Sequence, residues 1–222
     1  MACGTILQDR RRKPVLAHTS DGGRRWDLLP IKDAALSLFF LDERTGWMVG
    51  EKGGLFATAD GGRSWTSAKP AGVRAGPQPI RVFFLDASRG WLLCSRKQVY
   101  ETRDGGRSWQ LLAASREPGP DLPEGRTLYT QAAFFRQTGL ITGWSRLVDR
   151  RSRLPAWMEP DMASLGAGPT TTLALHSFDQ GRSWKSQLLP DFGEIARLRV
   201  SSAGAAVMLL RRPDSVSRPS EL

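Results

Sequence analysis

The sequence predicts an all-β protein that is built from repeated four-stranded antiparallel sheets. Two observations lead to this prediction: an eight-residue motif occurs four times, and a longer unit of short apolar runs repeats around it. With 222 residues, of which 40% are hydrophobic and 24% charged, the chain has an ordinary globular composition and can bury a core.

The repeated motif, here called the box, has the pattern Ser/Thr-x-Asp-x-Gly-Arg-x-Trp. An aspartate in a turn can accept hydrogen bonds from backbone N–H groups just downstream, and glycine supplies the positive φ that such turns need. The tryptophan brings a large apolar ring into the space between sheets. We therefore interpret the boxes as a repeated fold device, not as four active sites. The structural box residues are Asp21, Gly23, Trp26, Asp60, Gly62, Trp65, Asp104, Gly106, Trp109, Asp179, Gly181 and Trp184.

The longer unit predicts the strands. Residues 38–65 are echoed by residues 82–109, and each copy holds short apolar runs that are divided by turn-forming residues. Short runs rich in Val, Phe and Trp and closed by Gly and Asp are typical of strands in hairpins. The box aspartates are 39 residues apart (Asp21 to Asp60) and then 44 (Asp60 to Asp104). Four strands at this period are typical of a β-propeller blade.

The third gap, from Asp104 to Asp179, spans 75 residues. The half-unit before a box occurs once within it, at Thr138–Gly143, so we count one blade with an insertion at residues 144–169. We predict a propeller over residues 1–212 and a polar tail over residues 213–222. Its parts are a partial blade at 5–30, blades at 31–69, 78–113 and 127–190, and a partial blade at 194–212.

About four blades are therefore expected. This number suggests either a part of a larger ring or a ring that is completed by a second chain in a homo-oligomer, because exposed strand edges at both ends would invite association.

The box resembles the Asp-box, or bacterial neuraminidase repeat, of sialidases, some glycoside hydrolases and sortilin-type receptors. The fuller unit, from "FFLD" to the box, is more similar to the photosystem II assembly and stability factor family and its non-photosynthetic bacterial relatives. The resemblance covers residues 5–210 and implies a propeller that binds a protein, such as a membrane complex during assembly. The sequence contains no export signal, whereas relatives are often exported, so the compartment stays open.

The net charge of +10 favours an acidic partner. The turns between strands two and three, and between strands four and one, share the face opposite the boxes. The insertion and the segment Ser115–Arg126 both fall on this face, where added length often marks binding. We predict that this loop face docks an acidic or membrane-associated protein. Its binding residues are Arg10, Arg11, Arg12, Arg96, Lys97, Arg146, Arg150, Arg151, Arg153 and Trp157.

No catalytic residue, metal ligand or cofactor is predicted. A sialidase would need an arginine triad and a Tyr–Glu pair, but the chain has two tyrosines and lacks the Arg-Ile-Pro signature. Asp42 and Asp86 stand in equivalent slots of two repeats, which indicates turn chemistry. The alternative is a degenerate or truncated sialidase-like glycoside hydrolase that binds carbohydrate. Nucleic acid is not expected, because no recognition motif accompanies the basic residues.

Overall fold

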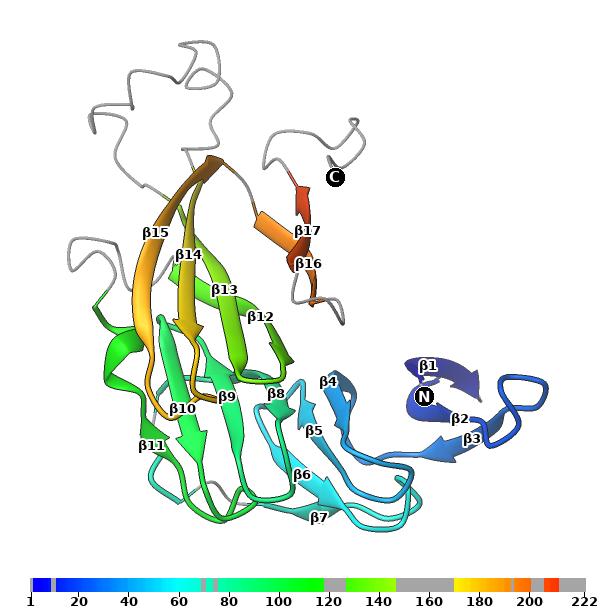
Figure 1. Ribbon diagram of the computed structural model, residues 1–222. Coiled ribbons are helices and arrows are strands. Elements are labelled where there is room, and N and C mark those ends of the chain that lie inside the picture. Colours follow the sequence, from blue (N-terminus) through cyan, green and yellow to red (C-terminus); the bar gives the residue numbers. More distant parts are fainter. Residues whose placement is uncertain are drawn as a thin grey trace. The chain divides into compact units, whose positions relative to one another are not determined.

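The computed structural model is all-β, as the sequence predicts (Figure 1). It describes residues 2–8, 11–68, 71–73, 76–117, 127–146, 170–192, 194–200 and 206–211. Within these residues the single helical element is the short 3-10 helix η1 (Ala113–Ser115). No helix in the described part of the chain is long and apolar enough to cross a membrane.

The chain divides into two compact units, and the first consists of Met1–Leu93 with Tyr100–Leu111. It begins with a three-stranded sheet of β1 (Ala2–Gln8), β2 (Arg11–His18) and β3 (Asp27–Pro30). The next sheet contains β4 (Ala35–Phe40), β5 (Gly46–Gly50), β6 (Leu55–Thr58) and β7 (Thr66–Ser67). A third sheet contains β8 (Pro79–Phe84), β9 (Gly90–Cys94), β10 (Gln98–Thr102) and β11 (Gln110–Leu111).

The second unit consists of Cys94–Val99, which is the turn between β9 and β10 with its flanks, and Leu112–Leu222. Its four-stranded sheet contains β12 (Thr127–Phe135), β13 (Thr138–Arg146), β14 (Thr170–Ser177) and β15 (Lys185–Phe192). Its two-stranded sheet contains β16 (Glu194–Val200) and β17 (Ala206–Arg211).

Within each unit, the first strand of one sheet packs against the preceding sheet. β8 lies against β4 and β5 in the first unit, and β16 lies against β12 and β13 in the second. Each four-stranded sheet is antiparallel and its strands follow chain order. Such up-and-down sheets, each stacked on the next, are the blades of a propeller. The predicted fold class, a partial β-propeller, is confirmed.

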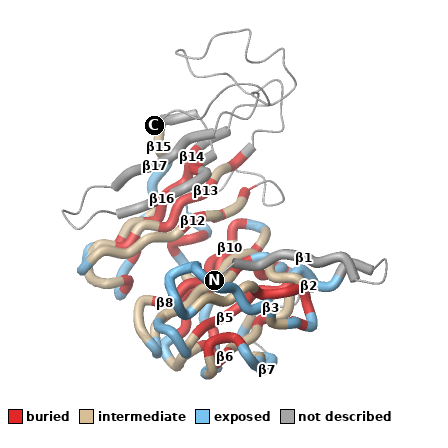
Figure 2. Tube along the Cα trace, turned by 90° about the vertical axis from the view of Figure 1, so that its right-hand side faces the viewer, coloured by how far each residue is buried: buried red, intermediate tan, exposed pale blue. Residues whose placement is uncertain are grey.

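The core of the first unit lies between these stacked sheets. All residues of β5 are buried (Figure 2), and so are all residues of β9. A middle strand has a neighbour on both edges and can be covered on both faces. Trp47 of β5 stacks on Phe84 of β8 with ring centroids 3.6 Å apart and 12° between the planes. Closer to the first sheet, Leu16, Ile31 and Met48 form a buried apolar cluster.

The second unit shows what the first residues of the predicted insertion form. Residues 144–146 continue β13 and pair with residues 170–172 of β14. The extra length is therefore partly strand, because the antiparallel ladder continues to satisfy backbone hydrogen bonds beyond the length of β5 and β6. The remainder, residues 147–169, lies outside the described residues.

Candidate functional site

The box turn is held by hydrogen bonds within its own eight residues. In the second box the Thr58 hydroxyl donates to Asp60 Oδ1 (2.7 Å) and accepts the N–H of Gly62 (2.9 Å). Asp60 Oδ1 also accepts the N–H of Ser64 (2.9 Å), and the Ser64 hydroxyl donates to Asp60 Oδ2 (2.5 Å). The third and fourth boxes repeat the same hydrogen bonds.

These hydrogen bonds favour the ionised carboxylates. Hydrogen bonds from the hydroxyl and then the N–H of Ser64 hold the pKa of Asp60 well below its ordinary value. The pKa values of Asp104 and Asp179 are lowered in the same way, because a serine stands at the equivalent position. A general acid needs a pKa raised toward the working pH, so these carboxylates are suited to a structural role.

The box tryptophans pack edge-on against a phenylalanine at the end of the first strand of their own sheet. The pairs are Phe40–Trp65 (6.0 Å between centroids, 79°), Phe84–Trp109 (6.1 Å, 75°) and Phe134–Trp184 (5.8 Å, 88°). Trp109 and Trp184 are buried and Trp65 is partly buried, but the expectation of an indole between sheets is wrong for Trp26, which is 50% exposed. The described part of its sheet, β1 to β3, contains no strand that could supply such a phenylalanine.

The structure describes the side chains of two of the ten predicted partner-binding residues. Arg96 and Lys97 lie in the turn between β9 and β10, and both have a φ of 59°. Arg96 is exposed. Lys97 is 6% exposed and its N–H donates to the carbonyl of Thr127 (2.9 Å), which corrects our expectation of a surface lysine. Outside the described residues lie Arg10, Arg150, Arg151, Arg153 and Trp157, and also the side chains of Arg11, Arg12 and Arg146.

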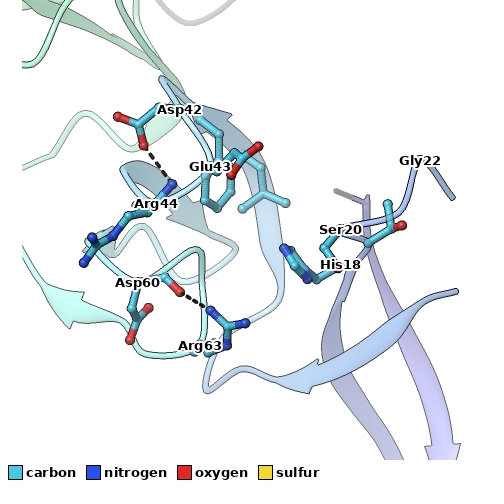
Figure 3. Close-up of a pocket in the computed structure, with 11 residues that line it drawn as sticks. His18, Ser20, Gly22, Asp42, Glu43, Arg44, Asp60 and Arg63 are labelled. Carbon is cyan, nitrogen blue, oxygen red and sulfur yellow. Dashed lines mark hydrogen bonds between the residues drawn. The ribbon is translucent and has the colours of Figure 1, made fainter.

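A cleft of about 830 Å³ lies on the box side of the first unit (Figure 3). It is formed where the first box meets the second box and the turn between β4 and β5. We call it the box cleft and define it by His18, Ser20, Phe40, Glu43 and Arg63, together with their neighbours in these turns. Sequence analysis placed binding on the opposite face and missed this cleft.

Five charged residues line the box cleft together with His18; they are Asp42, Glu43, Arg44, Asp60 and Arg63. Two of the carboxylates are held in turns. Asp42 Oδ1 accepts the N–H groups of Arg44 (2.7 Å) and Thr45 (2.6 Å), and Asp60 Oδ1 accepts hydrogen bonds from within its own box. The side chains of His18 and Glu43 lie on opposite walls of the cleft (Figure 3).

Asp42 and Asp86, the two carboxylates in equivalent slots of the repeats, accept hydrogen bonds from their own turns. Hydrogen bonds from the N–H groups of Thr45 and Arg44 lower the pKa of Asp42. Burial raises the pKa of Asp86, but hydrogen bonds from Ser88 and Arg89 outweigh it and lower the pKa to about 2. Within the described residues, no group of three His, Cys, Asp or Glu side chains could hold a metal ion.

The two tyrosines that a sialidase-like mechanism would draw on are both inside the protein. Tyr100 is 1% exposed and Tyr129 is 0% exposed. The Tyr129 hydroxyl donates to the carbonyl of Ser115 (3.4 Å), and burial raises the pKa of Tyr129. A phenol in this environment stays protonated at neutral pH and is closed to a substrate.

No protein-family model matches the sequence, and no curated protein sequence matches it. Among solved structures, the chain is similar to YCF48 bound to a D1 peptide, with 16% identity over 90% of this chain and 83% of that one, at a TM-score of 0.47. It is also similar to YCF48 from Cyanidioschyzon merolae, with 11% identity, coverage of 89% and 87%, and a TM-score of 0.46.

A third similar structure is the GH74 enzyme of Niastella koreensis, with 15% identity and a TM-score of 0.45. This match covers 79% of the present chain but 34% of the enzyme, so the chain spans about a third of that protein's length.

Proposed function

We propose that the chain is a non-catalytic propeller scaffold of the Asp-box type, similar to photosystem II assembly factor-like proteins, that docks an acidic protein partner. The observation that carries this proposal is that the carboxylates are held in their ionised form. In the described residues, every carboxylate with a shifted pKa accepts hydrogen bonds from its own turn, and every such shift is downward.

A glycoside hydrolase needs the opposite arrangement. One of its two carboxyl groups must carry a proton at the working pH, so its pKa has to be raised by burial or by a neighbouring negative charge. At the box cleft, Asp42 and Asp60 are instead ionised by donors from their own turns. The geometry therefore supports a binding role better than acid–base catalysis.

The turn that carries Arg96 supports docking through the loop face. Arg96 and Lys97 are two successive residues in the left-handed region of backbone conformation. Glycine or asparagine adopts this region at a lower conformational free energy. Such strain costs about 1–3 kcal/mol per residue and is concentrated at functional sites. The N–H of Lys97 anchors the turn to Thr127, and Arg96 is left exposed at its tip.

The test uses a fluorescein-labelled 20-residue peptide of Glu, Asp and Ser as an acidic probe, with binding followed by fluorescence anisotropy. We expect binding that weakens as salt rises, and a loss of affinity in Arg96→Glu. The matched control is Arg107→Glu, since Arg107 is an exposed arginine in the third box. Equal losses in both variants would leave net charge as the cause and would contradict a docking face.

The hydrolase alternative is tested in parallel. We expect no turnover of a panel of 4-nitrophenyl glycosides between pH 4 and 8. A rate that exceeds the buffer control and is lost when Glu43 is changed to glutamine would replace the scaffold proposal with a hydrolase.

A further inference from the structure

The second unit departs from the repeat at one end of its four-stranded sheet, where the fourth box adjoins the turn between β12 and β13. The N–H of Gln180 in the box donates to the carbonyl of Gln137 in this turn (2.8 Å), as the equivalent glycines of the second and third boxes donate to the turns beside them. We call these two turns, residues 135–138 and 177–185, the second-unit tip. The anchoring hydrogen bond is kept, but the side chains that the tip presents have changed.

The first change is an exposed aromatic side chain. Phe178 stands just before the box aspartate, where the other boxes have Ser20, Ala59 and Arg103. It is 69% exposed, the largest exposed fraction among the large apolar side chains of the described residues. Its ring contacts that of His176 at the end of β14, with centroids 5.4 Å apart. Because so exposed a ring buries little apolar surface, Phe178 contributes little to the stability of the fold.

The second change is backbone strain that the other boxes avoid. Gln180 has a φ of 62° at the position where each of the other three boxes has a glycine with a φ between 74° and 77°. Arg136, in the adjoining turn, has a φ of 53°. Glycine adopts this left-handed region at a lower conformational free energy than either residue. Strain of this kind is concentrated at functional sites.

The third change is a positive charge that no free carboxylate balances. The turn between β12 and β13 lacks the aspartate of the equivalent turns in the first unit and has Arg136, whose guanidinium lies over the ring of Phe135 (5.2 Å). Arg136, Arg182 and Lys185 are exposed, and none forms an ion pair with a carboxylate of the described residues. Asp179, the one carboxylate of the tip, accepts hydrogen bonds from its own box. The tip therefore presents three unpaired cations and one exposed ring.

We propose that the second-unit tip docks on an anionic lipid surface. The ring of Phe178 inserts at the boundary between the head groups and the acyl chains, and the three cations lie against the anionic head groups. Single-stranded nucleic acid is usually held by several aromatic platforms in a row, whereas the tip presents one exposed ring. The net charge of +10 adds a long-range attraction to an anionic surface.

The test uses the full chain with vesicles of phosphatidylcholine alone, or of phosphatidylcholine with about one third phosphatidylglycerol, and follows binding by co-sedimentation. We expect binding to the anionic vesicles that weakens as salt rises, and little binding to the neutral ones. Phe178→Ala, which gives the fourth box the residue of the second, should weaken binding about tenfold. Leu28→Ala is the matched control and should change nothing, since Leu28 is a 55% exposed apolar side chain beside the first box.

Two matched double variants separate the tip from the net charge. Arg136→Gln with Arg182→Gln should weaken binding roughly twentyfold, because each cation near an anionic surface contributes about fivefold. Arg63→Gln with Arg107→Gln removes the same charge from exposed positions of the second and third boxes, which have no exposed phenylalanine, and should weaken binding only slightly.

Arg136→Gly distinguishes a side chain kept for binding from one kept for the fold. Because the φ of Arg136 is 53°, glycine should raise the melting temperature, while loss of the cation should weaken vesicle binding about fivefold. A lower melting temperature with unchanged vesicle binding would assign Arg136 to the fold and count against the proposal.

Equal binding of the parent chain and Phe178→Ala to anionic vesicles would overturn the proposal, and so would equal losses in the two double variants. Tighter binding of a single-stranded oligothymidylate than of the vesicles, lost in Phe178→Ala, would assign the tip to nucleic acid instead. The tip shares no residue with the turn of Arg96, so this inference and the proposed function can fail separately. Loss of vesicle binding in Arg96→Glu, with full binding in Phe178→Ala, would reject the tip and assign the contact to the loop face.

Discussion

The first box and the third box have nearly the same sequence but different surroundings. Trp109 of the third box is 2% exposed and packs against Phe84, whereas Trp26 of the first box is 50% exposed. Yet both indoles donate the same local hydrogen bond, to the carbonyl of the glycine three residues earlier (3.1 Å in both). The local turn therefore forms in the same way in both boxes, and burial depends on what the rest of the sheet supplies.

A second difference lies inside the motif. The third box has Ser108 four residues after its aspartate, and its hydroxyl donates to Asp104 Oδ2 (2.6 Å). The first box has Arg25 there, which supplies the backbone N–H to Asp21 Oδ1 (2.9 Å) but no hydroxyl. One hydrogen bond to the carboxylate is therefore missing in the first box.

The largest effect is expected from removing the two indoles. Trp109→Ala should lower the free energy of unfolding by about 3–5 kcal/mol, because it leaves a cavity in a packed interface. Trp26→Ala should cost about 1–2 kcal/mol, since half of that side chain already lies in solvent. Urea unfolding followed by circular dichroism measures both. Equal losses would show that the two tryptophans are packed alike.

A smaller difference is expected between two box glycines. Gly62 and Gly23 have φ values of 84° and 92°, so alanine is strained at both by about 1–2 kcal/mol. A Cβ on Gly62 would also lie 2.7 Å from the buried Leu16, which adds about 1–3 kcal/mol of overpacking. A Cβ on Gly23 meets nothing closer than 3.7 Å. Gly62→Ala should therefore have the lower urea midpoint, and the reverse order would argue against the packing of Leu16 on the second box.

The pH dependence of stability should separate the boxes further. The folded-state pKa values of Asp60, Asp104 and Asp179 are lowered. Their ionised carboxylates therefore stabilise the fold fully above about pH 4, the ordinary pKa of an unfolded aspartate, and this stabilisation is lost as the pH falls below that value. Ser108→Ala raises the folded-state pKa of Asp104 toward its ordinary value. The urea midpoint of this variant should fall less steeply between pH 5 and 2 than that of the parent chain. A parallel pair of curves would mean that the serine does not act on the carboxylate.

The smallest effect is expected from Arg25→Ser, which restores the missing hydroxyl to the first box. The new donor should lower the pKa of Asp21 further, because serine donors are the largest cause of the lowered pKa in the other boxes. We expect a slightly higher melting temperature at pH 7, and a difference that is lost only as the pH falls through the lowered folded-state pKa of Asp21. A lower melting temperature at pH 7 would show that Arg25 contributes more than the hydroxyl.

Much of the fold could be predicted from residue types because its signals are local. Residues 38–65 were expected to hold strands, and two of their apolar runs, Trp47–Val49 and Leu55–Thr58, lie in β5 and β6. That the first residues of the insertion form strand could not be seen from the sequence, because nothing in Trp144 shows that it pairs with Thr172 and continues the ladder. Whether Lys97 is buried was equally invisible, since this depends on its packing in the second unit.

The box cleft was missed because its lining comes from two sheets. His18 lies in β2 of the first sheet, whereas Phe40 ends β4 of the second sheet and Glu43 lies in the turn that follows it. Nothing in either stretch of sequence shows that the two sheets bring these residues to one cleft.

The sequence by itself determined the box turns, since the aspartate, its hydroxyl donors and its glycines all lie within eight residues and can form their hydrogen bonds wherever the chain places them. Tertiary structure decided which indoles are buried, and it also brought the first and second boxes together at the box cleft. The reason is that burial and shape depend on pairs of side chains that only the stacking of one sheet on the next brings together.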